Sequence, residues 1–315
     1  ASRSSGIRTA PTGSATGRGP IAVRAAVGDL SGAASAQLEV LSQVADPVGA
    51  VRIPLERDAS AVGWRWDMRI GGRLLLPGVF RVRVRVTDRA GNVGTSAARL
   101  LRVRRPVRAQ VVYSLREAGN VVALTFDDCF SGSAMRRIIR AFHRAGASTT
   151  FFCNGANIAG NADAMRAAIA AGDTIGSHTW SHPQMPRLSY DEQVSQIQGD
   201  VDRWWQIGRA SPSPYFRPPY GLFNSTTVAA AGAAGFRWVV LWDVDPSDYL
   251  HPSPATLVQR VASHVRRGSI VVMHVEGNTA TAVPDLIAAV RAKGLEPVSL
   301  DEMMGRAAYL SPASG

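Results

Sequence analysis

The stretch VVALTFDDCF, residues 121–130, joins an apolar run to two adjacent aspartates. The apolar, β-branched run predicts a buried strand. The next segment, 131–146, predicts a helix, because Ile138, Ile139 and Phe142 recur on one of its faces. The order of strand, polar turn and helix indicates a βα unit with both aspartates at the carboxyl end of its strand.

The same rhythm continues to the end of the chain. Further strands are predicted within 148–155, 173–179, 215–221, 237–245, 268–275 and 296–300, with helices near 161–171, 189–205, 224–234, 255–266 and 282–293. The helix at 189–205 starts with a capping box, Ser189 with Glu192. No Gly-rich phosphate loop opens this region. The pattern therefore favours a distorted (β/α)7 barrel over an open doubly wound sheet.

The region before the barrel has a different pattern. Residues 1–20 are rich in Ser, Gly and Thr and predict a flexible tail. Residues 21–106 predict a small all-β, immunoglobulin-like sandwich, and residues 107–315 the barrel domain. In the clearest strand, 79–86, apolar residues alternate with arginines, namely Arg81, Arg83 and Arg85.

The net charge of +11 lies entirely in the first third of the chain. Residues 1–108 contain 18 arginines and 7 acidic residues, whereas the rest contains 17 of each sign. A row of arginines on one face of a strand suits an anionic cell-wall polymer, but arginines paired with neighbouring acids in a plain spacer domain fit the pattern too. No nucleic-acid-reading motif is present, and no apolar run is long enough for a transmembrane segment.

Chemically active side chains collect at the predicted strand ends. These are Asp127, Asp128, His178, His182, Arg217, Asp245, Asp248 and His274. The strand C-termini of a parallel barrel share one face, so these groups should converge. Taken alone, each has a plainer interpretation: a helix N-cap for the aspartates, a surface loop for the histidine pair, a rim salt bridge for Arg217 and a buried core histidine for His274.

His178 and His182 could bind a metal ion together if a carboxylate lies close enough to act as a third ligand. Two histidines three residues apart can share one metal if the segment turns helically. Asp128 would complete a set of two histidines and one carboxylate, which leaves coordination positions open for water and substrate.

Five motifs occur in a familiar order: TFDD (125–128), SHTWSHP (177–183), RPPYG (217–221), DPSDY (245–249) and VMH (272–274). This series resembles the motifs of the NodB-homology polysaccharide deacetylases, carbohydrate esterase family 4, across residues 121–304. The resemblance implies a distorted (β/α)7 barrel. It also implies metal-dependent hydrolysis of acetyl groups, usually N-acetyl groups on a hexosamine polymer.

By this resemblance, Asp128, His178 and His182 bind the metal. Asp127 is the general base, and Arg217 holds it in a charge-assisted contact. The expected metal is Zn²⁺, with Co²⁺ or Ni²⁺ also suited to these ligands.

The remaining roles follow from the last three motifs. His274 is the expected acid that protonates the leaving amine, and Asp245 is expected to orient it. The backbone N–H of Tyr220 is expected to bind the oxyanion, and Val272 to line the pocket for the acetyl methyl group. Trp242, near the fourth motif, is placed with the substrate.

The chain departs from the family pattern at three places. Cys129-Phe130 stands where Gly-Pro is usual, Tyr249 where Trp is usual, and Val275 where Asp is usual. No chemical group of the mechanism is lost, but the loop shape and the sugar preference are left open.

Cys129 and Cys153 lie just past the first strand and near the end of the second. Neighbouring strands stand about 4.8 Å apart, and disulfide Cα atoms are usually about 5.5–6 Å apart. We expect a disulfide, as in an exported enzyme. Two inert buried thiols, or a thiolate near the metal, are the alternatives.

The sequence therefore predicts a secreted or cell-wall-associated, zinc-dependent hydrolase that removes N-acetyl groups from peptidoglycan or a chitin-like polymer. The sequence starts at Ala1 without a methionine, so we expect any signal or anchor segment to have been removed ahead of it. An O-acetyl esterase acting on xylan is the alternative enzyme. A non-catalytic cell-wall glycan-binding protein is the alternative outside enzymes.

Overall fold

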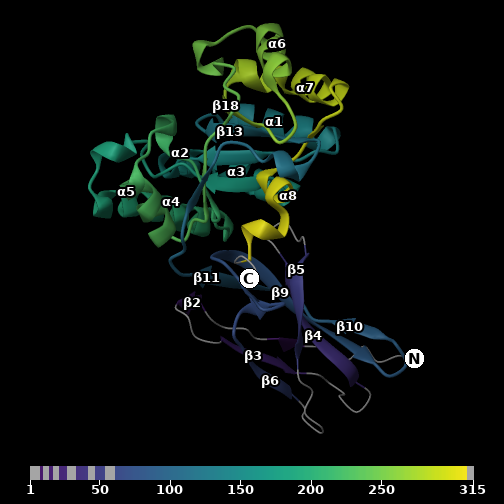
Figure 1. Cartoon of the computed structure of the whole chain (residues 1–315). Helices are drawn as coiled ribbons and strands as arrows, with labels where there is room; N and C mark the ends of the chain where they lie inside the picture. The colour runs from purple at the N-terminus through teal and green to yellow at the C-terminus, as the bar shows by residue number, and fades with distance from the viewer. Residues whose placement is uncertain are drawn as a thin grey trace. The chain divides into compact units, whose positions relative to one another are not determined.

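The chain forms two compact units (Figure 1). A computed structural model describes residues 8–9, 14–16, 21–26, 33–41, 47–53 and 61–310. The first unit contains the described residues up to Arg105 together with Tyr309 and Leu310, and the second runs from Pro106 to Ala308. The division lies at the boundary predicted for the barrel domain. Its C-terminal end differs from the predicted 107–315, because the carbonyl of Tyr309 accepts a hydrogen bond from Leu76 N–H at 2.8 Å.

The described elements of the first unit are all strands. One sheet has the order β2-β11-β9-β4-β5 with β10 on β9, a second has the order β1-β3-β6, and β7 pairs with β8. The strands are β1 (Arg8–Thr9), β2 (Ser14–Thr16), β3 (Ile21–Ala26), β4 (Ala33–Leu41), β5 (Pro47–Ile53), β6 (Ala61–Trp66), β7 (Arg69–Ile70), β8 (Arg73–Leu74), β9 (Gly78–Asp88), β10 (Val93–Thr95) and β11 (Arg99–Arg104). Within the predicted tail 1–20, β1 and β2 form short strands, and the other residues lie outside the described ones. The immunoglobulin-like arrangement stays a prediction.

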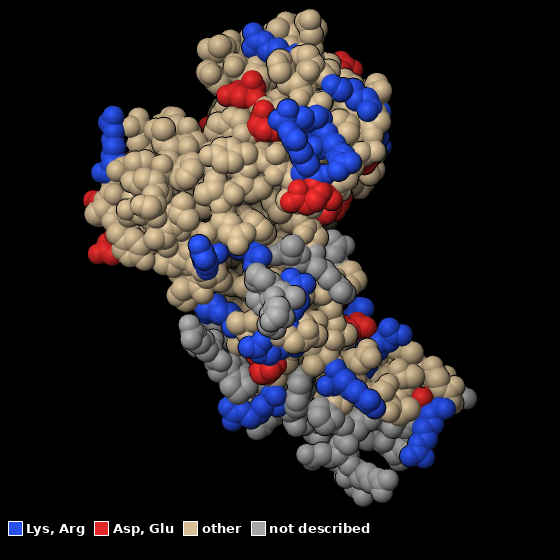
Figure 2. Space-filling model, in the orientation of Figure 1, with Lys and Arg blue, Asp and Glu red and all other residues tan. Residues whose placement is uncertain are grey.

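Strand β9 shows the alternation expected from its sequence. Its valines are buried, whereas Arg81 and Arg85 are exposed. Glu39 of the neighbouring β4 lies opposite Arg83 and contacts it at 2.6 Å, and it also contacts Arg85 at 3.5 Å. The arginine row is thus partly neutralised by its own sheet. Blue side chains still outnumber red ones on the face of this unit that Figure 2 shows.

The second unit is built on a parallel sheet. Its order is β12-β17-β16-β15-β14-β13-β18, with β19 pairing with β13. The strands are β12 (Gln110–Val112), β13 (Val121–Asp128), β14 (Thr150–Cys153), β15 (Thr174–Ser177), β16 (Tyr215–Phe216), β17 (Trp238–Val240), β18 (Ile270–His274) and β19 (Glu296–Pro297). Val244, just after β17, forms a parallel bridge to Val271 in β18. The sheet therefore curves back on itself, which fits the predicted distorted barrel.

Helices follow most strands, as predicted. They are α1 (Gly132–Arg144), α2 (Gly155–Gly160), α3 (Ala162–Ala171), α4 (Tyr190–Gly208), α5 (Ser225–Ala233), α6 (Pro254–His264), α7 (Gly277–Ala292) and α8 (Leu300–Met304). Short 3-10 turns lie at η1 (Arg116–Ala118), η2 (Met185–Arg187), η3 (Pro219–Gly221), η4 (Asp248–Leu250) and η5 (Gly305–Ala308). The predicted capping box of α4 is confirmed. Among the described residues, no helix combines the length and apolarity needed to cross a membrane.

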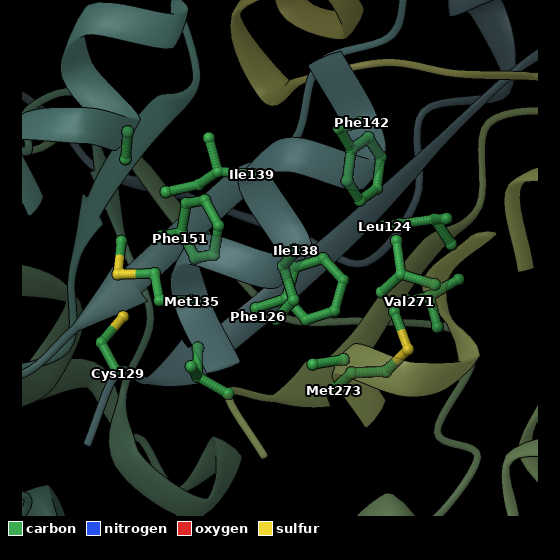
Figure 3. Close-up of a cluster of buried hydrophobic side chains, with 14 of the residues drawn as sticks. Leu124, Phe126, Cys129, Met135, Ile138, Ile139, Phe142, Phe151, Val271 and Met273 are labelled. Carbon is green, nitrogen blue, oxygen red and sulfur yellow. The ribbon is translucent and has the colours of Figure 1, made fainter. Parts of the chain in front are cut away.

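The core fixes the strand that carries both aspartates. Phe126 of β13 packs edge-on against Phe142 of α1, with ring centroids 6.0 Å apart, and lies 5.8 Å from the ring of Phe151 in β14. Leu124 and Ile138 lie in the same cluster (Figure 3). Burying each such side chain is worth roughly 1.5–3 kcal/mol. The strand therefore has little freedom up to its last residues.

Asp173, just before β15, is a buried carboxyl on which folding stability should depend. One oxygen accepts a hydrogen bond from Thr149 N–H at 3.1 Å, and the other has no donor among the described residues. Burial raises the pKa of Asp173 to about 7. The folded state therefore binds more protons than the unfolded state between about pH 4 and pH 7, and its stability falls as the pH rises through this window.

We expect Asp173→Asn to remove this loss, because the amide oxygen can still accept from Thr149. Relative to the wild type, the variant should gain about 2–3 kcal/mol of unfolding free energy as the pH rises from 5 to 8. Urea unfolding at both pH values measures the change. Asp285→Asn, on the exposed side of α7, is the control and should give the same difference at both. Parallel pH dependences for the wild type and Asp173→Asn would contradict the prediction.

Candidate active site

Three potential metal ligands meet at the carboxyl ends of the strands. Asp128 ends β13, His178 directly follows β15, and His182 lies four residues later. One ligand atom from each lies within 4.8 Å of the others. Asp128 Oδ1 is 3.6 Å from His178 Nε2 and 3.3 Å from His182 Nε2. Donors about 2.0–2.1 Å from a tetrahedral zinc ion are about 3.3 Å apart, so these separations suit one metal.

The protonation states also fit a metal. Burial lowers the pKa of both His178 and His182, which favours the neutral imidazole that binds metals. Nδ1 of His178 lies 2.8 Å from the carbonyl of Arg217, so it must donate, and Nε2 is left with its lone pair. Asp128 Oδ1 is buried without a hydrogen-bond donor among the described residues. Nε2 of His178 and Oδ1 of Asp128 are thus acceptors that face each other, an arrangement that a cation would satisfy, and the neutral ring of His182 can offer its Nε2 as the third ligand.

The spacing of His178 and His182 suggests that a helical turn holds the pair. In the structure the pair lies on an irregular turn instead. Thr179 and His182 both have left-handed backbones, with φ of 69° and 61°. The hydroxyl of Thr179 accepts a hydrogen bond from His182 N–H at 3.1 Å and closes the turn. The rings of His178 and His182 then lie 4.9 Å apart.

Asp127 and Arg217 form a buried ion pair beside this cluster. Nη1 of Arg217 donates to Asp127 Oδ1 at 2.6 Å and to Thr125 Oγ1 at 2.7 Å. Arg217 is 0% exposed and Asp127 is 3% exposed. The second oxygen of Asp127, Oδ2, lies 3.8 Å from His178 Nε2 and so faces the potential metal ligands.

The structure corrects the predicted partner of His274. Nδ1 of His274 lies 2.7 Å from Asp248 Oδ1, and Asp248 Oδ2 accepts from the backbone N–H of His274 at 2.6 Å. Asp245, the expected partner, is exposed and accepts from Ser247 N–H at 2.7 Å. The left-handed turn at Ser247, with φ of 56°, leaves Asp245 outside and brings Asp248 against β18. Both aspartates belong to the DPSDY motif, so spacing alone could not separate them.

His274 is held as an imidazolium. Burial disfavours the charged ring, but the hydrogen bond to Asp248 and the charges of Asp127 and Asp128 outweigh it and raise the pKa of His274 to about 9. Thr279 Oγ1 donates to Asp248 Oδ2 at 2.8 Å and helps to hold the carboxylate. His274 can therefore donate a proton at neutral pH.

The other predicted site residues have different environments. Tyr220 is left-handed with φ of 59°, is 59% exposed, and places its ring 4.5 Å from that of His182. Trp242 is half-buried, with its ring 5.6 Å from the Arg217 guanidinium. Val272 is buried within β18. Their predicted roles toward the substrate stay predictions.

The predicted disulfide is present. Cys129 is bonded to Cys153, with their Cα atoms 5.0 Å apart. Asp128 and Cys153 are paired residues of β13 and β14, so the bond joins the chain beside a potential metal ligand to the neighbouring strand. Neither alternative, two buried thiols or a thiolate at the metal, fits this structure.

A family model described as polysaccharide deacetylase matches residues 115–239. This part of the chain is therefore similar to polysaccharide deacetylases. The matched range includes Asp127, Asp128, His178, His182 and Arg217, whereas His274 lies beyond it.

Known proteins resemble this part of the chain at moderate identity. The chain is 32% identical over 196 residues to a bifunctional xylanase/xylan deacetylase of Cellvibrio japonicus, which covers 61% of this chain and 29% of that protein. It is 28% identical over 185 residues to the peptidoglycan-N-acetylglucosamine deacetylase PgdA of Listeria monocytogenes, which covers 58% of this chain and 39% of that protein. The chain thus spans less than half the length of either relative.

Solved structures share the fold of the barrel domain. A family 4 carbohydrate esterase from Streptomyces lividans, in complex with acetate, superimposes with a TM-score of 0.55 at 29% identity. The superposition covers 62% of this chain and 98% of that one.

Removing one partner of the Asp127–Arg217 ion pair should destabilise the protein more than removing both charges. Arg217→Met should lower the free energy of unfolding by roughly 3–5 kcal/mol, because it leaves Asp127 as a buried, unpaired charge. The double variant Asp127→Asn/Arg217→Met should lose less, since neither charge remains. Urea denaturation of both variants compares them. Equal or greater loss in the double variant would show that the unpaired charge is not the cause.

Proposed function

We propose that the barrel domain hydrolyses N-acetyl groups on a polymer of N-acetylhexosamine and releases acetate and the free amine. The observation that carries this proposal is the meeting of three potential metal ligands, a buried Asp–Arg pair and a His–Asp pair at one end of the barrel. The similarity to a peptidoglycan-N-acetylglucosamine deacetylase supports peptidoglycan, or a chitin-like chain, as the polymer.

The ligand set comprises Asp128, His178 and His182, and we propose Zn²⁺ as its occupant, with Co²⁺ or Ni²⁺ as alternatives. When bound, such an ion supplies Lewis acidity toward the acetyl carbonyl and lowers the pKa of water. The buried, donor-free Oδ1 of Asp128 and the lone pair on Nε2 of His178 support this assignment.

Asp127 is the proposed general base. Its Oδ1 is occupied by the Arg217 guanidinium, so Oδ2, which faces His178, is the oxygen that can accept a proton from the attacking water. Arg217 acts as a positioning residue, because its remaining donors bind the carbonyls of Val240 and Leu241 and fix the guanidinium.

His274 is the proposed general acid. Its Nδ1–H is used by Asp248, so Nε2–H is the proton available for the leaving nitrogen. The C–N bond breaks, its electron pair stays on nitrogen, and this proton completes the amine while the water oxygen ends in acetate. The backbone N–H of Tyr220 would bind the oxyanion, and Val272 and Trp242 would border the acetyl group.

Removal of O-acetyl groups from xylan is the second candidate function. The relative from Cellvibrio japonicus, named as a xylan deacetylase, favours it. The same base and the same metal ligands can attack an ester. An alkoxide is a better leaving group than an amide anion, so the ester reaction depends less on His274.

We further propose that the protein acts outside the cell on the wall. The disulfide suits an oxidising compartment. The basic first unit would bind an anionic wall polymer through Arg81, and through Arg83 and Arg85 to the extent that the single carboxylate of Glu39 does not neutralise these two arginines. If the site were inactive, the protein would act as a glycan-binding protein instead.

Acetate release is the deciding measurement. We expect the full chain to release acetate from N-acetylglucosamine oligomers or peptidoglycan faster than from acetylated xylan. A chelator should abolish the release, and added Zn²⁺ should restore it. Faster release from xylan would favour the esterase, and no release in the presence of Zn²⁺, Co²⁺ or Ni²⁺ would leave the glycan-binding alternative.

His274→Ala distinguishes the chemistry of the two substrates. Loss of general acid catalysis should lower kcat on the amide by about 10²–10⁴-fold, and by a smaller factor on an acetyl ester, because an amine needs protonation to leave. Steady-state kinetics on both substrates provide the measurement. An equal loss on both would contradict the assigned role.

The matched controls are the two aspartates of one motif. Asp248→Asn should reduce amide hydrolysis substantially, because it removes the carboxylate that charges His274. Asp245→Asn should leave kcat within about twofold, since its side chain is exposed and its hydrogen bond from Ser247 N–H lies within its own turn. The reverse order would show that Asp245 is the functional partner.

A further inference from the structure

The potential metal ligand Asp128 lies on an unusual stretch of backbone. Asp128 and Cys129 are consecutive left-handed residues, with φ of 69° and 56°. For residues other than glycine this conformation costs roughly 1–2 kcal/mol each, and it persists only where the surroundings enforce it. Cys129 stands where the family pattern usually has glycine, so in this chain another constraint must hold the turn.

Helix α2 and the residue that follows it supply side-chain amides to this turn. Asn157 Nδ2 donates to the carbonyl of Asp128 at 3.0 Å. Asn161 Nδ2 lies within hydrogen-bond distance of the carbonyls of Cys129 and Phe130, at 3.1 and 3.2 Å. Its Oδ1 accepts from Gly132 N–H at 3.0 Å. Three successive carbonyls and the start of α1 are therefore bound by two asparagines.

The disulfide holds the same turn from the other side. It joins Cys129 to Cys153 at the end of β14, and Asn154 and α2 follow directly in sequence. Both the covalent bond and the amide donors thus come from one continuous segment, 153–161. A peptide released from these contacts would leave the left-handed region, and the Cα–Cβ bond of Asp128 would point in a new direction.

We propose that Cys129–Cys153, Asn157 and Asn161 form a clamp that positions Asp128 for metal binding. The inference rests on the proposed function, because it concerns the same ligand set. These are positioning residues: they contact the backbone of residues 128–130, while the Asp128 carboxylate faces His178 and His182. A glycine would adopt the left-handed backbone at position 129 readily. In this chain the disulfide and the two asparagines hold Cys129 in that conformation.

A pair of double variants tests the role of the disulfide. Cys129→Ala/Cys153→Ala removes the bond and keeps a side chain at the left-handed position. Cys129→Gly/Cys153→Ala removes the same bond but tolerates the left-handed backbone. We expect the alanine variant to bind Zn²⁺ about 10- to 100-fold more weakly than the wild type, and the glycine variant to recover most of that affinity.

The measurement is the Zn²⁺ dissociation constant, from competition with a chromophoric chelator, together with the visible spectrum of the Co²⁺-loaded protein. Neither readout requires turnover. If both double variants bind Zn²⁺ as tightly as the wild type, or if both lose affinity equally, the disulfide does not act through the Asp128 turn.

Single variants with the disulfide intact test the amides. Asn157→Ala and Asn161→Ala should each weaken Zn²⁺ binding by about tenfold or more. Asn154→Ala is the control, because it removes the N-cap of the same helix but no hydrogen bond to residues 128–130. It should lower the apo-protein Tm as much as the others yet keep the Zn²⁺ affinity. Loss of Tm without loss of affinity in Asn157→Ala and Asn161→Ala would overturn the clamp.

The outcomes also separate this inference from the proposed function. Wild-type protein that binds Zn²⁺ but releases no acetate contradicts the proposed deacetylase activity and leaves the clamp supported if the variants behave as expected. Active wild-type protein with unchanged Zn²⁺ affinity in all clamp variants contradicts the clamp alone.

Discussion

The buried guanidinium of Arg217 is the constraint on which the site depends. It donates to Asp127 and Thr125 on β13 and to the carbonyls of Val240 and Leu241 at the end of β17. Its Cζ atom lies 4.1 Å from the centroid of the Phe152 ring. One planar cation thus ties together strands that are not neighbours in the sheet. A group with fewer fixed donors could not satisfy these positions at once.

Charge pairing gives each carboxylate of the site a distinct role. Asp127 is paired with Arg217, and Asp248 with His274. Asp128 directly faces two imidazoles whose pKa values burial lowers, and neither is held as a cation. A divalent cation would supply the missing charge. The same arrangement keeps a proton acceptor and a proton donor on adjacent strands, because Asp127 and His274 are paired residues of β13 and β18.

The backbone at the strand ends is as specific as the side chains. Asp128, His182, Tyr220 and Ser247 all have positive φ, and each lies in or beside one of the sequence motifs. Such conformations re-aim side chains over one or two residues, which a regular helix or strand cannot do. Their cost must be offset by surrounding contacts, such as the Thr179 hydroxyl at His182 and the Asn157 amide at Asp128.

The sequence by itself determined the alternation of strands and helices, the barrel, the residues at the strand ends and the cysteine pair, because periodicity and motif order are local properties. Only the tertiary structure decided that Asp248, and not Asp245, hydrogen-bonds to His274. It also decided that Glu39 forms ion pairs with Arg83 and Arg85, and that Tyr309 belongs to the first unit. It also revealed Asn157 and Asn161. These contacts depend on turn geometry and on strands distant in sequence, and several alternatives have the same spacing and chemistry until the backbone chooses among them.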